Sequence, residues 1–286
     1  EALVFLESHP SEERLILQNH PGEAPVLNAG DADALTFSGA GGITVKGLTL
    51  SGVTGSAILA VNATDLRFEA MTVESCSSGE TGAIAFFSDC SGILLKETAF
   101  IGNTGTSLFL NNVTAPRVED CEFRGNTGSA QTLVTGTSSD VEILNGVYED
   151  NLGPSTGGFS LLSLSQTEGP VTVSGNRVRY TETPASVYES AIAVSVTQTG
   201  GVAIRNNVIE QFAFLAEGGG LTGIGIHVQG TETTPVAPLE LSDNRLDETA
   251  GPALWLNRCA DVTMRDNAYT APVLVEASTT VGLVRP

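Results

Sequence analysis

The segment VTVSGNRV at residues 171–178 recurs as VAIRNNVI at 202–209, LELSDNRL at 239–246 and VTMRDNAY at 262–269. These segments share one eight-residue frame, with apolar residues at positions one, three and eight and asparagine at position six. The frame also fits five earlier segments, which begin at residues 43, 66, 93, 116 and 141 but lack the asparagine. Nine copies in one register indicate an internal repeat.

The spacing of the copies predicts a solenoid. Successive copies begin 23 to 37 residues apart, and a period of about 20 to 50 residues is typical of solenoid proteins. Positions one to three alternate apolar and polar residues, which is the pattern of a strand with one buried face. Turn residues and another apolar strand follow each copy. We therefore predict an all-β parallel β-helix of about ten coils, whose strands pair with their equivalents in neighbouring coils.

The repeat runs through the chain without a linker, so we expect one β-helix domain over residues 1–286. Residues 1–42 are expected to form irregular first coils, and residues 43–280 regular ones. The extra residues of the longer coils should bulge outward as loops. These loops are expected at residues 151–158, 181–189, 211–223 and 229–238.

The charge of the chain restricts its partners. The formal net charge is −20, from 33 acidic and 13 basic residues. This surface repels a phosphate backbone, which excludes nucleic acid as the expected partner. It also disfavours strongly anionic polysaccharides, so neutral glycans or calcium-bridged acidic glycans fit better. No apolar run is long enough to predict a membrane span.

The repeat stacks equivalent residues into columns along the solenoid. At position six, we expect the last four copies to form an asparagine ladder, because stacked amides can bond to one another and to the backbone. Its members are Asn176, Asn207, Asn244 and Asn267. At position four, Lys46, Glu69, Lys96 and Glu119 alternate in sign, which favours a surface charge ladder.

The four cysteines are Cys76, Cys90, Cys121 and Cys259. They lack paired spacing and have no nearby histidines, which argues against a zinc site. We expect buried thiols.

The frame V-x-V-x-x-N-x-V, the repeat of about 23 residues and the asparagine ladder together resemble the right-handed parallel β-helix proteins of the pectin-lyase-like superfamily. The segments NHPGEAPVL at 19–27 and ITVKGLTL at 43–50 look like the opening coils of secreted bacterial members. The resemblance covers roughly residues 15–280 and implies a right-handed solenoid. It leaves the activity open, because that superfamily includes lyases, hydrolases, epimerases, tailspikes and adhesins.

The resemblance to lyases implies a basic side chain that removes a proton next to a uronate carboxylate, with arginine or calcium to neutralise the charge. The best arrangement here is Lys96 as the base with Arg117 about one coil away. Carboxylates beside them offer a calcium site, formed by Glu97, Glu119 and Asp120. A charge ladder is the alternative explanation for both bases. The NTD, DD, GHG and RIK motifs of hydrolases with this fold are absent.

Sugar binding by this fold calls for aromatic platforms, for which Trp255 and Tyr148 are the candidates. If Leu254 and Leu256 point inward, Trp255 points outward and can stack on a sugar; the opposite alternation buries it.

Two functions follow from these observations. The first is a secreted or cell-surface carbohydrate-interacting protein that acts as a polysaccharide lyase or glycoside hydrolase. The second is a non-catalytic extracellular module, such as an adhesin, a tailspike-like protein or a surface structural protein. The expected partner is a polysaccharide or a cell-surface glycan, with self-association of the solenoid, end to end or side by side, as a further expectation.

Overall fold

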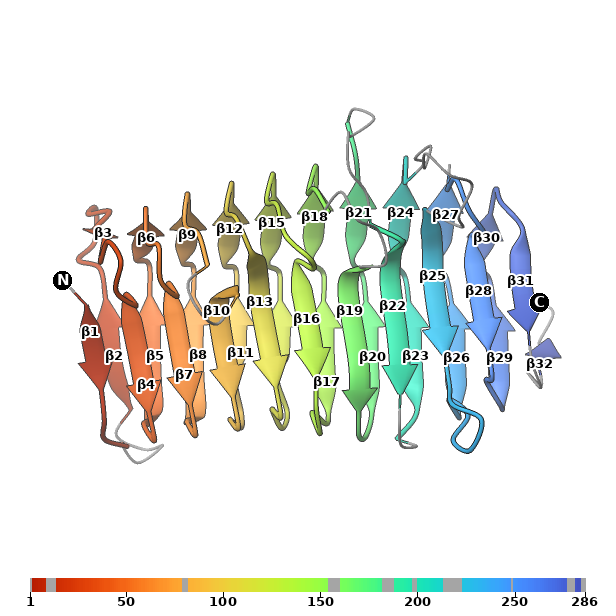
Figure 1. Cartoon of the computed structure of the whole chain (residues 1–286), viewed down its shortest axis with the longest axis horizontal. Coiled ribbons are helices and arrows are strands. Elements are labelled where there is room, and N and C mark those ends of the chain that lie inside the picture. The colour runs from red at the N-terminus through yellow and green to blue at the C-terminus, as the bar shows by residue number, and fades with distance from the viewer. Residues whose placement is uncertain are drawn as a thin grey trace.

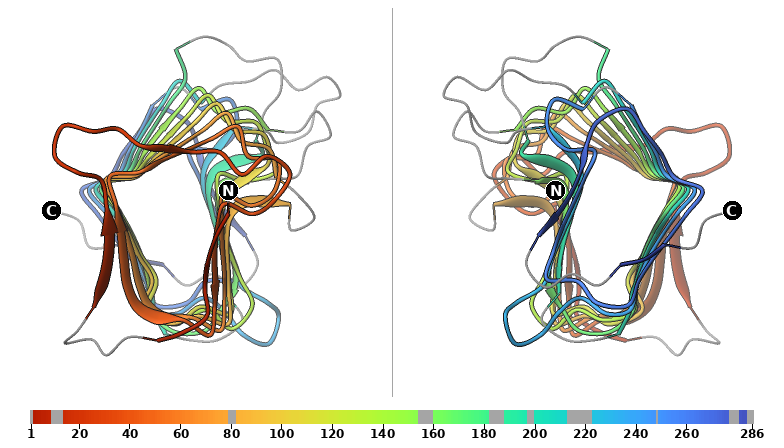
Figure 2. Two further views of the ribbon diagram at one scale, coloured as in Figure 1. Left: turned by 90° about the vertical axis from the view of Figure 1, so that its left-hand side faces the viewer. Right: turned by 90° about the vertical axis from the view of Figure 1, so that its right-hand side faces the viewer.

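The computed structural model describes residues 2–8, 14–78, 82–153, 160–181, 188–196, 200–212, 223–247, 249–276 and 281–283. Every regular element in these ranges is a β-strand. The strands stack side by side along the long axis of the molecule, with the two ends of the chain at opposite ends of the stack (Figure 1). Viewed along that axis, the coils superimpose in a roughly three-sided outline (Figure 2). Within the described ranges, no helix could cross a membrane.

The three sides of the solenoid are parallel sheets, here named A, B and C. Sheet A contains β1 (Leu3–Phe5), β4 (Leu35–Ser38), β7 (Ile58–Val61), β10 (Ala83–Ser88), β13 (Thr106–Asn111), β16 (Thr132–Thr135), β19 (Ser160–Thr167), β22 (Ser190–Val196), β25 (Ile224–Gln229), β28 (Leu254–Asn257) and β31 (Val273–Glu276). Sheet B contains β2 (Leu15–Gln18), β5 (Gly41–Lys46), β8 (Thr64–Glu69), β11 (Leu94–Lys96), β14 (Arg117–Glu119), β17 (Val141–Leu144), β20 (Val171–Ser174), β23 (Val202–Arg205), β26 (Leu239–Ser242), β29 (Val262–Arg265) and β32 (Val281–Leu283). Sheet C contains β3 (Val26–Leu27), β6 (Thr49–Ser51), β9 (Thr72–Glu74), β12 (Ala99–Ile101), β15 (Glu122–Arg124), β18 (Val147–Glu149), β21 (Arg177–Arg179), β24 (Val208–Glu210), β27 (Arg245–Asp247) and β30 (Ala268–Tyr269).

The pairing confirms the predicted register and the parallel β-helix. Val171, the first residue of its frame, lies opposite Val141 and Val202, the first residues of the neighbouring frames. Each coil contributes one strand to each sheet, and the described strands number eleven, eleven and ten, against a prediction of about ten coils. The first coil is more regular than expected, because β1, β2 and β3 pair in register with β4, β5 and β6.

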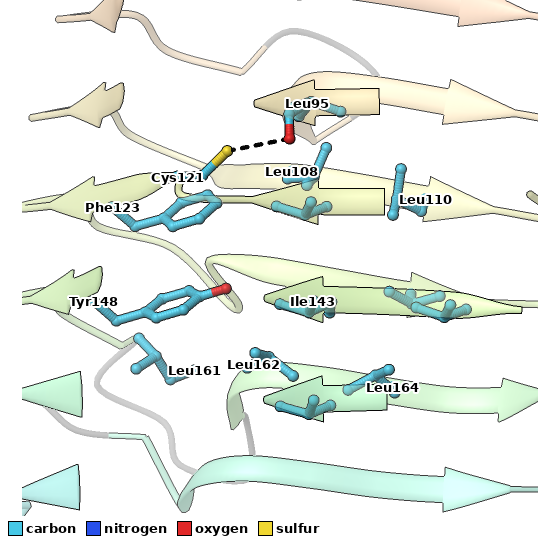
Figure 3. Packing of buried hydrophobic residues seen from close by; sticks show 14 of the residues in the cluster. Leu95, Leu108, Leu110, Cys121, Phe123, Ile143, Tyr148, Leu161, Leu162 and Leu164 are labelled. Atoms are coloured by element: carbon cyan, nitrogen blue, oxygen red, sulfur yellow. Dashed lines mark hydrogen bonds between the residues drawn. The ribbon is translucent and has the colours of Figure 1, made fainter. Parts of the chain in front are cut away.

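Alternating residues of the strands fill the interior. Position eight supplies a stack of aromatic rings. Phe123 stacks on Tyr148 with ring centroids 4.7 Å apart (Figure 3), and Phe100 stacks on Phe123 from the other side at 5.1 Å. Burial of each such side chain contributes about 1.5–3 kcal/mol. The Cys121 thiol lies beside this stack and contacts the Leu95 carbonyl oxygen at 3.6 Å. All four cysteines are buried, as predicted.

The predicted asparagine ladder lies at the bend from sheet B to sheet C. The side-chain amide of Asn176 donates to the Asn207 side-chain oxygen at 3.0 Å and to the Ile143 carbonyl at 3.0 Å. The same pattern continues through Asn244 to Asn267. Position five of the frame makes the bend itself, because Asp243 and the equivalent residues have left-handed backbone angles, with φ of 56° at Asp243.

A second asparagine ladder, which the sequence analysis did not predict, lies at the turn from sheet C to sheet A. Its rungs are Asn103, Asn126 and Asn151, whose amides are joined by hydrogen bonds of 3.0 Å. Each rung also donates to the carbonyl of a residue in the preceding coil, such as Phe100 for Asn126. The hydroxyl of Tyr180 donates to the Asn151 carbonyl at 2.7 Å and closes this ladder.

Three of the long connections join sheet C to sheet A, and the fourth, at 229–238, joins sheet A to sheet B. Residues 154–158, 182–187 and 213–222 of the predicted loops lie outside the described residues. The second connection ends at Tyr188, which is fully buried. Its hydroxyl accepts a hydrogen bond from the Gln131 amide at 2.8 Å and lies 2.9 Å from the Gly128 carbonyl oxygen. Tyr188 thereby fixes the end of this connection to earlier coils.

Candidate functional site

The predicted catalytic residue Lys96 lies on the outer face of sheet B, opposite Glu69 and Glu119 in the neighbouring strands. The expected charge ladder forms only in part, since the Lys46 amine contacts the Glu69 carboxylate at 3.2 Å. Among the described residues, no carboxylate lies within 4 Å of the Lys96 amine. A surface lysine without a carboxylate partner does not by itself form an active site. Its predicted role as a base stays a prediction.

The predicted partner Arg117 is held by carboxylates. Its guanidinium lies 3.1 Å from Glu119 and 3.0 Å from Glu142. The hydrogen bond to Glu119 raises the pKa of Arg117. To neutralise a uronate, this side chain would have to leave both glutamates.

The residues predicted to bind calcium have different structural roles. Glu97 and Asp120 occupy left-handed positions of the bend from sheet B to sheet C, with φ of 52° and 54°. Asp120 accepts a hydrogen bond from the Asn145 amide at 3.1 Å, and Glu119 is paired with Arg117. Across the part of the chain that the structure describes, no three His, Cys, Asp or Glu residues cluster closely enough to hold a metal ion. Calcium binding at these residues stays a prediction.

The prediction that Tyr148 binds substrate is wrong. Its side chain is 1% exposed and stacks on Phe123 inside the solenoid. Its hydroxyl bonds to the Thr132 hydroxyl at 3.1 Å, and burial raises its pKa. Tyr148 fills position eight of the frame, which faces the core in the coils on either side. It is therefore a core residue.

Trp255 lies outside the core, on the outer face of sheet A. Leu254 and Leu256 are buried, so the alternation of β28 directs Trp255 outward. The indole ring stacks on the imidazole of His227 in the adjacent strand, with ring centroids 4.4 Å apart and an interplanar angle of 8°. Burial lowers the pKa of His227, and the nearby charge of Glu276 opposes this shift. The two rings form a flat, half-buried pair.

A row of polar side chains runs beside this aromatic pair. Asn257 follows Trp255 by two residues and therefore lies on the same face of β28. Its neighbours in register are Gln229 and Glu276. We name the group formed by His227, Trp255, Gln229, Asn257 and Glu276 the sheet A platform.

The sheet A platform holds polar atoms without partners. His227 Nε2, Trp255 Nε1 and Asn257 Oδ1 are buried and have no hydrogen-bond partner among the described residues. An unsatisfied buried polar group costs about 1–3 kcal/mol, so three of them in one place call for an explanation. A ligand that docks here and displaces the atoms covering them can supply the missing partners.

The face of sheet A changes towards the middle of the solenoid. The outward residues next to His227 are Ala193 and then Ser163, both small, and beyond them lies Leu133. The strands that carry these small residues, β19 and β22, directly follow long connections from sheet C. The sheet A platform thus adjoins the part of sheet A where the long connections enter.

The outer face of sheet B is hollowed in places. One of about 360 Å³ lies around Arg117 and Glu142, and one of about 320 Å³ lies around Arg205 and Glu240. Among the described residues, no aromatic side chain lines either of them. Gly200 lines the second hollow, and a Cβ there would lie 2.0 Å from the Gly169 carbonyl carbon, so only glycine fits at this position.

The sequence predicts Trp255 as a binding residue but does not predict His227 as its partner. The signal was present, because IGIHVQ at 224–229 and ALWLN at 253–257 place both rings between two inward apolar residues. The long connection at 229–238 obscured their alignment.

Comparison with solved structures gives similar folds at low identity. The mannuronan C-5 epimerase AlgE6 A-module of Azotobacter vinelandii is 12% identical, with 98% of this chain and 88% of that chain covered and a TM-score of 0.45. The surface adhesin PfbA of Streptococcus pneumoniae is 10% identical, with 92% and 78% covered and a TM-score of 0.47. The DFA-IIIase of Arthrobacter chlorophenolicus A6 is 12% identical, with 98% and 74% covered and a TM-score of 0.43. Similarity at this level assigns no function to this chain.

The sequence comparisons give one assignment. No curated protein matches the chain. The family described as "Right handed beta helix region" matches residues 33–209, which is more than half of the sequence, and the chain belongs to this family.

Proposed function

We propose that the protein binds a glycan on the sheet A platform, with the Trp255 indole as the stacking surface. The observation that carries this proposal is the outward-facing stack of Trp255 on His227 beside polar atoms that lack partners. Binding without catalysis is the simplest function that these residues support.

The chemistry of the platform suits a sugar. The apolar face of a pyranose ring packs against an aromatic ring, while hydroxyl groups at its edge need donors and acceptors. The Trp255 N–H is a donor, the Asn257 side-chain oxygen is an acceptor, and Gln229 offers both. A formal net charge of −20 favours a neutral glycan over an anionic one. The proposal includes a secreted or cell-surface location, where such polymers are exposed.

A polysaccharide lyase is the second candidate, favoured by the Lys96 amine, which has no carboxylate within 4 Å among the described residues. This reading keeps Lys96 as the base, Arg117 as the positive charge, and calcium at Glu97, Glu119 and Asp120 as expected from the sequence. It predicts that calcium and a uronate polymer together give an unsaturated product, detected by its ultraviolet absorbance, and that Lys96→Ala abolishes it. Product formation by Lys96→Ala would reject this site.

Binding is tested by calorimetric titration of a panel of neutral and acidic oligosaccharides. Trp255→Ala should weaken binding about tenfold, because aromatic stacking contributes roughly 0.5–1.5 kcal/mol beyond area burial. Trp255→Phe should retain part of the affinity. Phe86→Ala is the matched control, since Phe86 is also a half-buried aromatic residue on the outer face of sheet A but lies in another coil.

Two outcomes would contradict the proposal. One is the absence of binding across the whole panel. The other is an equal loss of affinity in Trp255→Ala and Phe86→Ala, which would indicate a general effect on the sheet.

A further inference from the structure

A hollow of about 350 Å³ lies on the outer face of sheet C, away from the sheet A platform. We name it the sheet C hollow. Its lining consists of Arg177, Arg179, Glu210, Gln211, Arg245 and Asp247. These residues come from β21, β24 and β27 and the turn after β24, so the hollow spans three neighbouring coils.

The charge of the sheet C hollow differs from that of the whole molecule. Among the described residues of its lining, three arginines face two carboxylates, which leaves one excess positive charge. The entire chain carries −20. A local positive charge on a negatively charged protein attracts an anionic group to that place.

The excess charge can be assigned to Arg179. In register, Arg179 lies between Glu149 of β18 and Glu210 of β24. Both of these carboxylates are engaged by other arginines: Glu149 by Arg124 at 3.1 Å, and Glu210 by Arg177 at 2.8 Å.

The remaining guanidinium of the hollow is also paired, because Arg245 contacts Asp247. Within the described residues, Arg179 has no carboxylate within 4 Å. Lys96 shares this property, but no hollow described above has Lys96 in its lining. Among the described residues and the hollows named above, an unpaired cation and a concave surface coincide at Arg179.

We propose that the sheet C hollow is a binding site for a small monocarboxylate that also carries hydroxyl groups. The planar guanidinium of Arg179 can donate two parallel hydrogen bonds to a carboxylate, a geometry that an ammonium group does not provide. Glu210 and Asp247 accept hydrogen bonds from hydroxyl groups, and the Gln211 amide can donate or accept. A charge of +1 matches one carboxylate rather than a dianion.

The size of the hollow supports this class of ligand. Its volume lies at the lower end of the range of about 300–1,000 Å³ for small-molecule sites. Adjacent strands are about 4.8 Å apart, so three coils span about 10 Å. A polyhydroxy monocarboxylate of six carbons fits within this length.

The proposal is tested by calorimetric titration with gluconate, and with sorbitol, acetate and inorganic phosphate as comparison probes. Gluconate should bind with a Kd of about 1 mM, in keeping with one exposed bidentate contact. Sorbitol lacks the carboxylate and should not bind, and acetate should bind more weakly than gluconate. Added salt should weaken binding, because the contact is exposed.

Variants separate Arg179 from the general charge of the sheet. Arg179→Gln should weaken gluconate binding at least tenfold, and Arg179→Lys should restore only part of it. Arg205→Gln is the matched control, because Arg205 is also a partly exposed arginine but lies on sheet B, is paired with Glu240 and is not part of the lining of the sheet C hollow. Circular dichroism checks that each variant keeps the fold.

Several results would overturn the proposal. They are equal binding by wild type and Arg179→Gln, an equal loss in Arg205→Gln, binding of sorbitol as tight as that of gluconate, or tighter binding of phosphate. Trp255→Ala should leave gluconate binding unchanged, so this proposal and that of glycan binding on sheet A can fail independently.

Discussion

The N-terminal and C-terminal halves of the solenoid fix their corners in different ways. In the N-terminal half, Asn103, Asn126 and Asn151 form a ladder at the turn from sheet C to sheet A. In the C-terminal half, the ladder of Asn176, Asn207, Asn244 and Asn267 lies at the bend from sheet B to sheet C. Both ladders use the same kind of hydrogen bond between side-chain amides. The halves therefore differ in which corner of the solenoid these amides support.

The length of the connections between sheets C and A changes where the first ladder ends. Residues 102–105 and 125–131 are short connections in the part held by the first ladder. The connection at 150–159 contains Asn151, the last rung, and it and the next two, at 180–189 and 211–223, are long. The connections at 248–253 and 270–272 are short again, so the long connections are confined to the coils at the end of the ladder and directly after it. The sheet A platform lies beside them.

The largest expected effect is the loss of a middle rung. Asn126→Leu and Asn207→Leu should each reduce the free energy of unfolding by roughly 3 kcal/mol or more, because each leaves several buried backbone and amide groups without partners. Urea unfolding followed by circular dichroism measures both. Similar losses would show that the two ladders are equivalent supports.

The end rung provides the control for this comparison. Asn267 is only partly buried and has no further rung after it among the described residues, so Asn267→Leu should cost less than Asn207→Leu. Losses below about 1 kcal/mol at both middle rungs would contradict the structural role of the ladders.

A smaller effect is expected at the tether of the second long connection. Tyr188→Phe removes the hydroxyl that accepts from Gln131 and should cost about 1–2 kcal/mol, since the Gln131 amide loses a buried partner. Thermal unfolding gives the change. Tyr269→Phe is the control, because no hydrogen bond of its hydroxyl is found in the described part of the chain, and an equal loss in both variants would argue against the tether.

The smallest effect concerns pH. The folded pKa of His227 lies below its ordinary value of 6.5 because the ring is half-buried, so the folded chain binds fewer protons than the unfolded chain. Its contribution to stability is therefore complete above pH 6.5 and is lost as the pH falls through the folded pKa. His227→Gln should flatten this part of the pH dependence of urea unfolding. An unchanged slope would show that His227 does not titrate as described.

The sequence predicted the fold well because the repeat acts through strand alternation, which is local. Position six also predicted one ladder, since its asparagines share the frame. The other ladder escaped because Asn103 and its equivalents lie after the frame ends. Tyr148 was misassigned although the frame itself makes position eight apolar. The stack of His227 on Trp255 depends on a register across coils of unequal length, which local patterns do not reveal.

Glycan binding on the sheet A platform is tested most directly by the fluorescence of the only tryptophan in the chain. A glycan that binds by calorimetry should shift the Trp255 emission and protect it from a soluble quencher, with the same midpoint as the calorimetric titration. Calorimetric binding of the same glycan with unchanged emission and unchanged quenching would place the binding site elsewhere.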